Sequence, residues 1–189
     1  ISLSHNGVLF LDELPEWDRK ALEVLREPLE SGTVTVSRAA RSSEFPARFQ
    51  LVAAMNPCPC GWAGDPSGRC RCSPEHIRRY RARISGPLMD RIDLHIEVPR
   101  LPPQDLRPDA PNGEATVFIR ARVEQARTVQ LQRTGKANAQ LGQAETMAFC
   151  RLQDRDQALL ERAIERLQLS ARSMHRILRV ARTIADLAG

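Results

Sequence analysis

An apolar run that ends in two adjacent acids is the feature that most constrains the fold of this chain. Residues 7–17 read GVLFLDELPEW, and the apolar residues 8–11 are typical of a strand in a parallel sheet covered on both faces. Asp12 and Glu13 follow this strand directly. Ligands of open α/β sheets bind outside the carboxyl ends of the strands, so we expect the acid pair at such an edge. The plainer alternative is a strand end whose acids stabilise the start of the next helix.

Composition narrows the class of protein. The chain has 189 residues, 42% of them hydrophobic, which is enough for a packed core in one large or two small domains. Its net charge of +5 permits a polyanionic partner without requiring one. No apolar stretch approaches the roughly 18–20 residues of a membrane span, and the opening ISLSHNG is not a signal peptide. We therefore expect a cytoplasmic protein with no membrane partner and, since the chain lacks an initiator Met, a piece of a longer protein.

Hydrophobic periodicity predicts alternating helices and strands in the first half of the chain. A helix is expected over 18–30, with Asp18 as its N-cap and Gly32 as its stop signal. The β-branched segment 33–38 predicts a strand, the polar stretch AARSSE interrupts it, and residues 46–56 predict another strand whose segment 51–55 is buried. We expect a β-hairpin that leads into a core strand. A basic helix over 74–83 and a strand over 92–98 follow.

The second half of the chain has a different sequence pattern from the first half. Residues 99–113 are rich in proline, which predicts a linker between an α/β part, residues 1–98, and a helical domain, residues 114–189. Helices are predicted over 115–133, 144–151, 154–168 and 171–187. The last helix should begin at the N-cap Ser170 and pack an apolar stripe into the core; the stripe comprises Met174, Ile177, Leu178, Ala181, Ile184, Ala185 and Ala188.

Three further polar residues occupy positions that nucleotide hydrolysis would use. Asn56 follows a second apolar strand, where its amide could orient a water molecule. Arg91 precedes the predicted strand 92–98, and a guanidinium that reaches the phosphates of a neighbouring subunit neutralises charge in the transition state. Arg172 lies early in the last helix. Of the two acids after strand 8–11, the first can hold the Mg²⁺ bound to a nucleotide and the second can orient or deprotonate the attacking water. The pair therefore fits a Walker B element.

Four segments in this order, GVLFLDEL, SGTVTVSRAARSSEFPARFQLVAAMNPCPCG, ISGPLMDRIDLHIEVP and SARSMHRILRVARTIADL, resemble the magnesium-chelatase-like AAA+ ATPases. Among these the chain most resembles the competence-protein (ComM/YifB) group, over nearly its whole length. The resemblance implies an α/β fold: the C-terminal part of an AAA+ P-loop domain, from Walker B onward with an inserted β-hairpin, followed by an α-helical lid domain. It implies a homo-hexamer that hydrolyses ATP with Mg²⁺ and acts on DNA, with a role in branch migration during recombination and transformation. The implied roles are Mg²⁺–nucleotide acid for Asp12, catalytic base for Glu13, sensor 1 for Asn56, arginine finger in trans for Arg91 and sensor 2 for Arg172.

One departure from the family pattern limits what these residues can do alone. The sequence contains no GxxxxGK[ST], the loop that cradles the phosphates of the nucleotide. We expect this loop to lie before Ile1, so that the chain holds half of the nucleotide site. The 189 residues alone are then expected to bind ATP weakly or not at all and not to hydrolyse it.

Two basic segments are candidates for polyanion contact. Arg38 and Arg41 lie on the predicted hairpin, and hairpins before sensor 1 in related AAA+ helicases point into the central pore. These arginines would follow a DNA backbone, or they are ordinary surface residues of a solvated hairpin. The second segment carries Arg78, Arg79, Arg81 and Arg83; a subunit interface or a solvated face is favoured there over a nucleic-acid face.

The sequence CPCGWAGDPSGRCRC places four cysteines, Cys58, Cys60, Cys70 and Cys72, in two pairs across a short loop. Four thiolates can form a tetrahedral zinc site, which would give order to a loop rich in Gly and Pro. The C-x-C spacing is tighter than in typical zinc knuckles, and a reduced thiol cluster is the alternative. His76 is near enough in sequence to replace one ligand, and Cys150 is expected to be a buried small hydrophobe.

Two other functions stay open from the sequence. The chain could belong to an ATPase that remodels a protein or serves a magnesium-chelatase-type complex, although no porphyrin-binding feature is evident. It could also be a non-catalytic nucleic-acid-binding module ordered by zinc. The acid pair, with Asn56 and Arg91, argues against the second alternative, because a binding module has no use for a general base.

Overall fold

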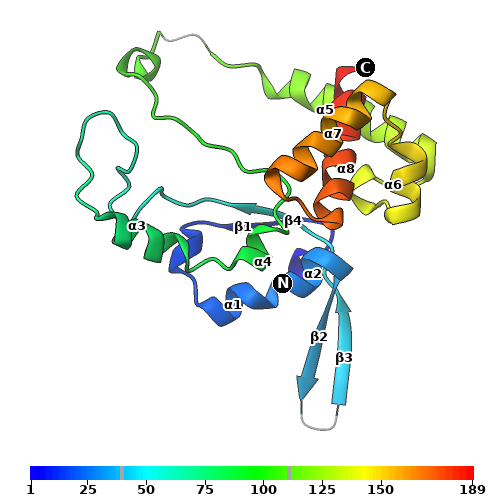
Figure 1. The fold of residues 1–189 in the computed structure, drawn as a ribbon, viewed down its shortest axis with the longest axis horizontal. Helices are drawn as coiled ribbons and strands as arrows, with labels where there is room; N and C mark the ends of the chain where they lie inside the picture. The colour runs from blue at the N-terminus through cyan, green and yellow to red at the C-terminus, as the bar shows by residue number, and fades with distance from the viewer. Residues whose placement is uncertain (39–40, 110–111) are drawn as a thin grey trace. The chain divides into compact units, whose positions relative to one another are not determined.

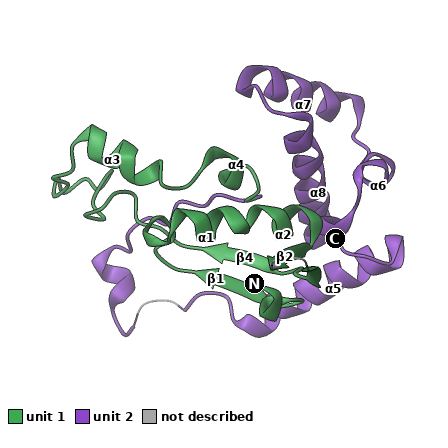
Figure 2. Ribbon diagram, turned by 90° about the horizontal axis from the view of Figure 1, so that it is seen from below, with its two compact units in different colours: residues 1–92 green, residues 93–189 purple. Residues whose placement is uncertain are grey.

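The computed structural model describes the chain except residues 39–40 and 110–111, and it describes the backbone but not the side chain of Arg38. The chain divides into two compact units, residues 1–92 and 93–189 (Figures 1 and 2). Among the described residues, no helix has both the length and the apolar character needed to cross a bilayer.

Unit 1 contains two small two-stranded sheets with short helices between and after them. Strand β1 (Val8–Leu11) pairs in parallel with β4 (Gln50–Ala53), and β2 (Thr33–Arg38) pairs antiparallel with β3 (Arg41–Pro46). The helices are α1 (Arg19–Val24), α2 (Arg26–Ser31), α3 (Pro74–Arg81) and α4 (Gly86–Met89). Short 3₁₀ turns cover Ser2–Ser4 and Leu14–Glu16.

One face of the β1–β4 pair carries the core of unit 1. Leu9 and Leu11 of β1 and Leu51 of β4 point to this face and join a cluster with Leu14, Leu22, Leu25, Ile84 and Leu88. Helices α1 and α2 run along the same side of the strands (Figure 2). The alternation of strand side chains therefore places every second residue of each strand on the opposite face.

That opposite face corrects the prediction of a sheet covered on both sides. Val8 and Phe10 are each 59% exposed, and Val52 of β4 is 40% exposed, so the predicted burial of residues 51–55 is also wrong. The apolar run predicted the strands correctly but not their surroundings, because a run without polar residues hides which face is buried.

Three other sequence predictions are corrected by the structure. Residues 92–98, all of them described, form neither helix nor strand, and Leu94, Ile96 and Val98 are exposed. The described part of the polar stretch that was expected as an interruption, residues 41–44, instead belongs to the returning strand β3 of the hairpin. The predicted helix over 18–30 is two helices that meet at Leu25. Its N-cap is confirmed, since the Asp18 carboxylate accepts hydrogen bonds from two backbone N–H groups, 2.9 and 3.1 Å away.

The β2–β3 hairpin is anchored to α2 at its base and extends away from the β1–β4 strands (Figure 1). Glu27 of α2 accepts a hydrogen bond from the Thr35 hydroxyl at 2.7 Å, and Val34 is buried. Gly32 links helix and strand with φ +76°, and a Cβ there would lie 2.7 Å from Cγ of Arg48. The turn therefore requires glycine, as the stop signal predicted.

Unit 2 is helical, as predicted. Its helices are α5 (Thr116–Thr134), α6 (Gln143–Phe149), α7 (Asp154–Leu167) and α8 (Ala171–Ala188), and 3₁₀ turns cover Pro103–Leu106 and Asn138–Gln140. The N-cap of α8 is confirmed, because the Ser170 hydroxyl accepts a hydrogen bond from the Ser173 N–H. Cys150 is buried beside Leu141, Leu160 and Leu178, as expected of a small hydrophobe.

The predicted apolar stripe of α8 is largely wrong. Of that stripe only Leu178 is buried, whereas Ile184 is 61% exposed. Asp186, whose side chain is 3% exposed, lies in the interior instead. The prediction failed because the helical period of apolar residues gives no sign that a charged residue forms an ion pair in the interior.

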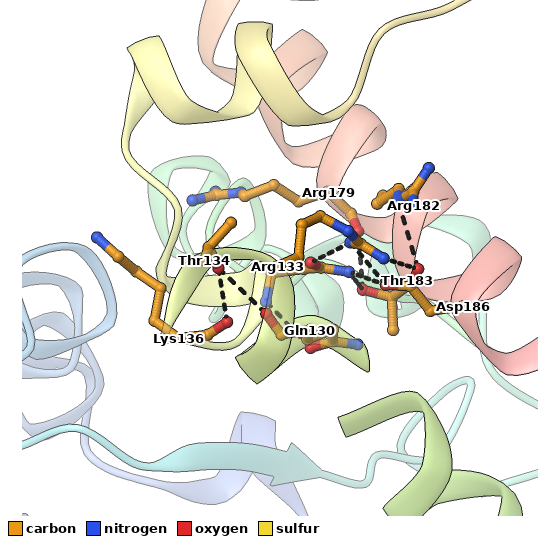
Figure 3. Close-up of polar contacts among 9 residues, drawn as sticks. Gln130, Arg133, Thr134, Lys136, Arg179, Arg182, Thr183 and Asp186 are labelled. Atoms are coloured by element: carbon orange, nitrogen blue, oxygen red, sulfur yellow. Dashed lines mark hydrogen bonds and ion pairs between the residues drawn. The ribbon is translucent and has the colours of Figure 1, made fainter. Parts of the chain in front are cut away.

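A polar network ties α5 to α8 (Figure 3). Both Nη atoms of Arg133 contact the two carboxylate oxygens of Asp186, and Arg182 lies 3.3 Å from the same carboxylate. The Asn138 amide donates to Asp186 at 2.8 Å and to the Thr183 hydroxyl at 3.1 Å. Burial raises the pKa of the Asp186 carboxyl, but hydrogen bonds from Arg133 and Asn138 outweigh it and hold the pKa below 3.8. The carboxylate is therefore ionised and paired inside the unit.

Candidate functional site

The acid pair lies in a tightly held turn after β1. Asp12 and Glu13 are both exposed, and Asp12 Oδ1 accepts a hydrogen bond from the Glu13 N–H at 2.8 Å. The Asp12 carbonyl accepts from the indole N–H of Trp17, also at 2.8 Å. The next N–H, of Leu14, donates to the Ala54 carbonyl at 2.9 Å. The turn is thus fixed to the strand beside it, with both carboxylates on its surface.

Glu13 adopts a left-handed backbone conformation, φ +49° and ψ +46°. A non-glycine residue there costs about 1–2 kcal/mol and persists only where the surroundings enforce it. The enforcing contacts are the buried side chains of Leu14 and Pro15 and the hydrogen bond to Ala54. A strained acid at a strand end favours a functional role over the simple capping role.

Asn56 lies at the same edge of the sheet as the acid pair. In the parallel β1–β4 register Leu11 is the partner of Ala53, so Asp12 and Asn56 both follow the carboxyl ends of adjacent strands. The Ala54 N–H also donates to the Leu11 carbonyl at 2.9 Å, which extends the pairing past the strand ends. Asn56 itself is exposed. The structure therefore brings three of the predicted residues to one edge.

Tyr80 joins this edge and was missed by sequence reasoning. Its side chain is buried, and burial raises the pKa of its phenol. The charges of Glu16 and Glu13 raise it further, while a hydrogen bond with the backbone of Asn56 acts in the opposite direction. The phenol thus lies beside both strand-end segments. The one signal in the sequence that could have indicated this role is that Tyr80 is a single tyrosine within an arginine-rich segment.

Arg91 and Arg172 occupy other places. The Arg91 side chain is 13% exposed, its Nη2 lies 2.5 Å from the Glu30 carboxylate, and its Nη1 donates to the Pro87 carbonyl at 2.6 Å. Within the chain, its recorded partners are residues of α2 and α4 rather than the acid pair. Arg172 is the second residue of α8 and is exposed.

The basic segment around α3 braces unit 1. Arg81 Nε donates to the Pro57 carbonyl at 3.1 Å, and Arg83 contacts both the Pro15 carbonyl and the Glu16 carboxylate, the latter at 2.6 Å. Arg78 and Arg79 pair with Glu75 on the same helix. These contacts fit the interpretation of a structural or interface helix better than that of a nucleic-acid face.

The two hairpin arginines lie at the far end of β2–β3. Arg41 is exposed at the start of β3, and Arg38 is its backbone partner at the end of β2. The side chain of Arg38 lies outside the described part of the structure.

The four clustered cysteines converge. Their Sγ atoms all lie within 4.8 Å of one another, and the recorded separations are 3.4 Å for Cys58–Cys60, 3.8 Å for Cys58–Cys70 and 3.7 Å for Cys60–Cys70. Four sulfurs around a tetrahedral zinc, at about 2.3 Å from it, lie about 3.8 Å apart. A disulfide would bring two sulfurs to about 2.05 Å. The group comprises these four cysteines without His76.

The surroundings of the thiols also fit a cation. Backbone N–H groups of Trp62 and Arg71 lower the pKa of the Cys60 thiol to about 6, and the N–H of Ala63 lies 3.3 Å from Sγ of Cys58. The hydrogen bond with Cys60 raises the pKa of Cys72 to about 11. A divalent metal binds thiolates, so its binding would favour the ionised form of all four side chains. The donor set therefore fits zinc.

Comparison with known proteins shows the family of the chain. Residues 1–106 match the family described as "Magnesium chelatase, subunit ChlI", and residues 113–189 match its C-terminal counterpart. The chain belongs to this magnesium-chelatase-like AAA+ family. Within the family it falls in the ComM/YifB group, as the relatives show. It is 53% identical over 190 residues to "Competence protein ComM" of Haemophilus influenzae and 49% identical over 188 residues to "Uncharacterized protein YifB" of Escherichia coli.

These alignments cover 100% and 99% of the chain but 37% of each relative, so the chain spans little more than a third of their length. A more distant similarity, 30% identity over 94 residues, links half of the chain to 10% of the "DNA replication licensing factor mcm-6" of Caenorhabditis briggsae. The family was thus correctly predicted from the sequence segments.

Proposed function

We propose that this chain is part of an ATP-hydrolysing, hexameric AAA+ motor that acts on DNA, with a branch-migration or helicase-like role in recombination and natural transformation. The observation that carries the proposal is the acid pair at the carboxyl edge of β1, with Glu13 in an enforced left-handed conformation. The family supports an ATPase, and the names of two relatives, a competence protein and a replication licensing factor, support DNA as the substrate.

The chemistry assigns a task to each residue. Asp12 would hold the Mg²⁺ that neutralises phosphate charge when nucleotide is bound, since carboxylate oxygens are the ligands that Mg²⁺ prefers. Glu13 would take the proton of the attacking water, and Asn56 would orient that water. The phosphate-cradling loop is absent from the sequence, so we propose that the 189 residues alone do not hydrolyse ATP.

Two arginines would complete the site from elsewhere. Arg91 would act on the nucleotide of a neighbouring subunit, and to do so it must exchange its ion pair with Glu30 for the phosphates. Arg172 would contact the nucleotide from the start of α8, so that the helical domain acts as a lid that responds to ATP. Both assignments rest on the family resemblance.

The test is ATP turnover by the full-length protein, with and without single-stranded and branched DNA. Turnover that DNA stimulates supports the motor. Turnover indifferent to DNA would instead favour the first rival, an ATPase that remodels a protein or serves a magnesium-chelatase-type complex. Absence of turnover, with DNA binding retained, would favour a non-catalytic module ordered by zinc.

Charge reversal on the hairpin should uncouple the motor from DNA. In the full-length protein, Arg38→Glu with Arg41→Glu should abolish DNA stimulation while the basal rate stays within about twofold, because phosphate contacts are electrostatic and the hairpin extends away from β1 and β4 (Figure 1). Arg155→Glu with Arg162→Glu, which makes the same charge change at two exposed arginines of α7, is the control and should retain stimulation. Stimulation that survives the hairpin reversal would remove the hairpin from DNA contact.

We also propose that the four-cysteine group binds one structural Zn²⁺ and that the protein works in the reducing cytoplasm, where clustered thiols persist. Protein purified under reducing conditions and without chelator should contain about one equivalent of zinc per chain by elemental analysis. The sulfur separations near those of a tetrahedral site are the physical reason. Less than about a tenth of an equivalent would contradict the proposal.

A further inference from the structure

The loop that carries the four cysteines begins and ends at functional elements. Cys58 lies two residues after Asn56 and five residues after the end of β4. Cys72 directly precedes Ser73, the N-cap of α3, whose hydroxyl accepts a hydrogen bond from the His76 N–H at 3.2 Å. A link between the two cysteine pairs therefore joins the candidate catalytic edge to the start of α3.

The loop has almost no buried side chains that could hold its two ends together. Of residues 58–72, all of which the structure describes, only Cys58 is buried. The recorded backbone hydrogen bonds are local turns, such as the Gly61 N–H to the Cys58 carbonyl at 2.9 Å, and Arg69 stacks 4.9 Å from the ring of Trp62. Without an apolar core, the contact among the four sulfurs is what closes the loop.

The Asn56–Pro57 segment lies between this loop and α3. On one side, the Pro57 carbonyl accepts from Arg81 Nε at 3.1 Å, and the buried Tyr80 precedes Arg81 in the same helix. On the other side, Gly61 adopts φ +77°, and a Cβ built there would lie 3.8 Å from Asn56 Oδ1. The segment that carries the amide is thus in contact with α3 and adjoins the cysteine loop.

We propose that zinc held by Cys58, Cys60, Cys70 and Cys72 is a positioning device: it fixes Asn56 and the start of α3, and its occupancy sets the rate of ATP turnover rather than nucleotide affinity. This inference rests on the proposed function for the role of Asn56. The cysteines act through Asn56 and are positioning residues, since Cys58 lies two residues after Asn56 in the chain and Gly61 of the loop lies near the Asn56 side chain.

The first test uses Cys72→Ser in the full-length protein, with Cys150→Ser as a matched control that makes the same change at a cysteine outside the cluster. Cys72→Ser should lose most of its zinc and lower kcat by about tenfold or more, while the dissociation constant for ADP stays within about twofold. Cys150→Ser should keep its zinc and its kcat. Chelation of zinc from the wild-type protein should reproduce the loss, and added zinc should restore the rate, which guards against a variant that fails to fold.

A second readout is independent of activity. On zinc removal, hydrogen exchange should accelerate at residues 54–58 and 74–82, while β2–β3 and α5–α8 keep their protection. In a double mutant, Cys72→Ser should add little to Asn56→Ala, because both remove the same positioned amide.

The outcomes separate the two proposals. Zinc lost with kcat and exchange at residues 54–58 unchanged would overturn the inference and leave the ATPase standing. A protein that contains no zinc would overturn it as well. If the wild-type protein does not hydrolyse ATP, the proposed function fails, and the exchange at residues 54–58 alone decides whether the metal positions Asn56.

Discussion

Glu13→Gln in the full-length protein should lower kcat for ATP by about 10²- to 10⁴-fold, the usual contribution of a general base, while ATP binding persists. The amide has the size of the carboxylate but cannot accept the proton of the attacking water. Glu13 is exposed, so its replacement should change the free energy of unfolding by no more than about 0.5 kcal/mol. Single-turnover kinetics and a nucleotide binding assay on the same preparation separate the chemical step from binding.

Glu16→Gln is the matched control for this prediction. Glu16 is an exposed acid at the end of the same 3₁₀ turn, and its recorded ion pair is with the half-exposed Arg83. Loss of such a surface pair costs about 1 kcal/mol at most, so Glu16→Gln should keep kcat within about twofold. Equal rates for the wild-type protein and Glu13→Gln would show that the acid pair only caps the turn and would remove the observation on which the proposed function rests.

Local sequence signals predicted the element boundaries well. The helix caps and the helix stop depend only on neighbours three or four residues away in the chain. Each works through a hydrogen bond or a backbone conformation that its residue type favours, as at Asp18, Gly32 and Ser170. For the same reason the acid pair could be placed at a strand end from the sequence alone. The convergence of the four cysteines was also predictable, because two pairs on one short loop have few ways to lie apart.

Predictions that depended on distant residues were less successful. The polar strand β3 was missed because its residues are exposed on both faces, which removes the alternation that signals a strand. The partner of Arg91 is Glu30, 61 residues away, and that of Asp186 is Arg133, 53 residues away. Periodicity along a helix or strand carries no information about such pairs. Tyr80 was missed similarly, since its contact with the Asn56 segment depends on how α3 packs.

Asp186→Asn should be among the most destabilising conservative substitutions in unit 2. The Asp186 side chain is 3% exposed and that of Arg133 is 15% exposed, so the amide would leave a guanidinium without its counter-charge in the interior. Removal of one partner from a buried ion pair costs about 3–5 kcal/mol. Urea unfolding of the full-length protein, with hydrogen exchange followed at α5 and α8 to assign the loss to this unit, measures the effect.

Glu114→Gln provides the comparison, because it breaks the Glu114–Arg122 pair of the same unit, whose side chains are 42% and 53% exposed. That change should cost about 1 kcal/mol or less. In the double-mutant cycle, Arg133→Met should be much less costly in the Asp186→Asn background than in the wild-type protein, since the ion pair is already broken. Equal costs of Asp186→Asn and Glu114→Gln would show that the network of Figure 3 adds nothing to stability beyond a surface pair.

The pH dependence gives an independent check on the same carboxylate. Its pKa in the folded chain lies below the ordinary value of 3.8, so the native state binds its proton less readily than the unfolded state does. The stabilisation by Asp186 is therefore fully present above about pH 4 and is lost as the pH falls through the folded-state pKa. The difference in unfolding free energy between the wild-type protein and Asp186→Asn should stay constant from neutral pH down to about pH 5 and shrink below about pH 4. A difference that grew on acidification would mean that the buried carboxyl is protonated rather than paired with Arg133, because a protonated acid would be stabilised at low pH.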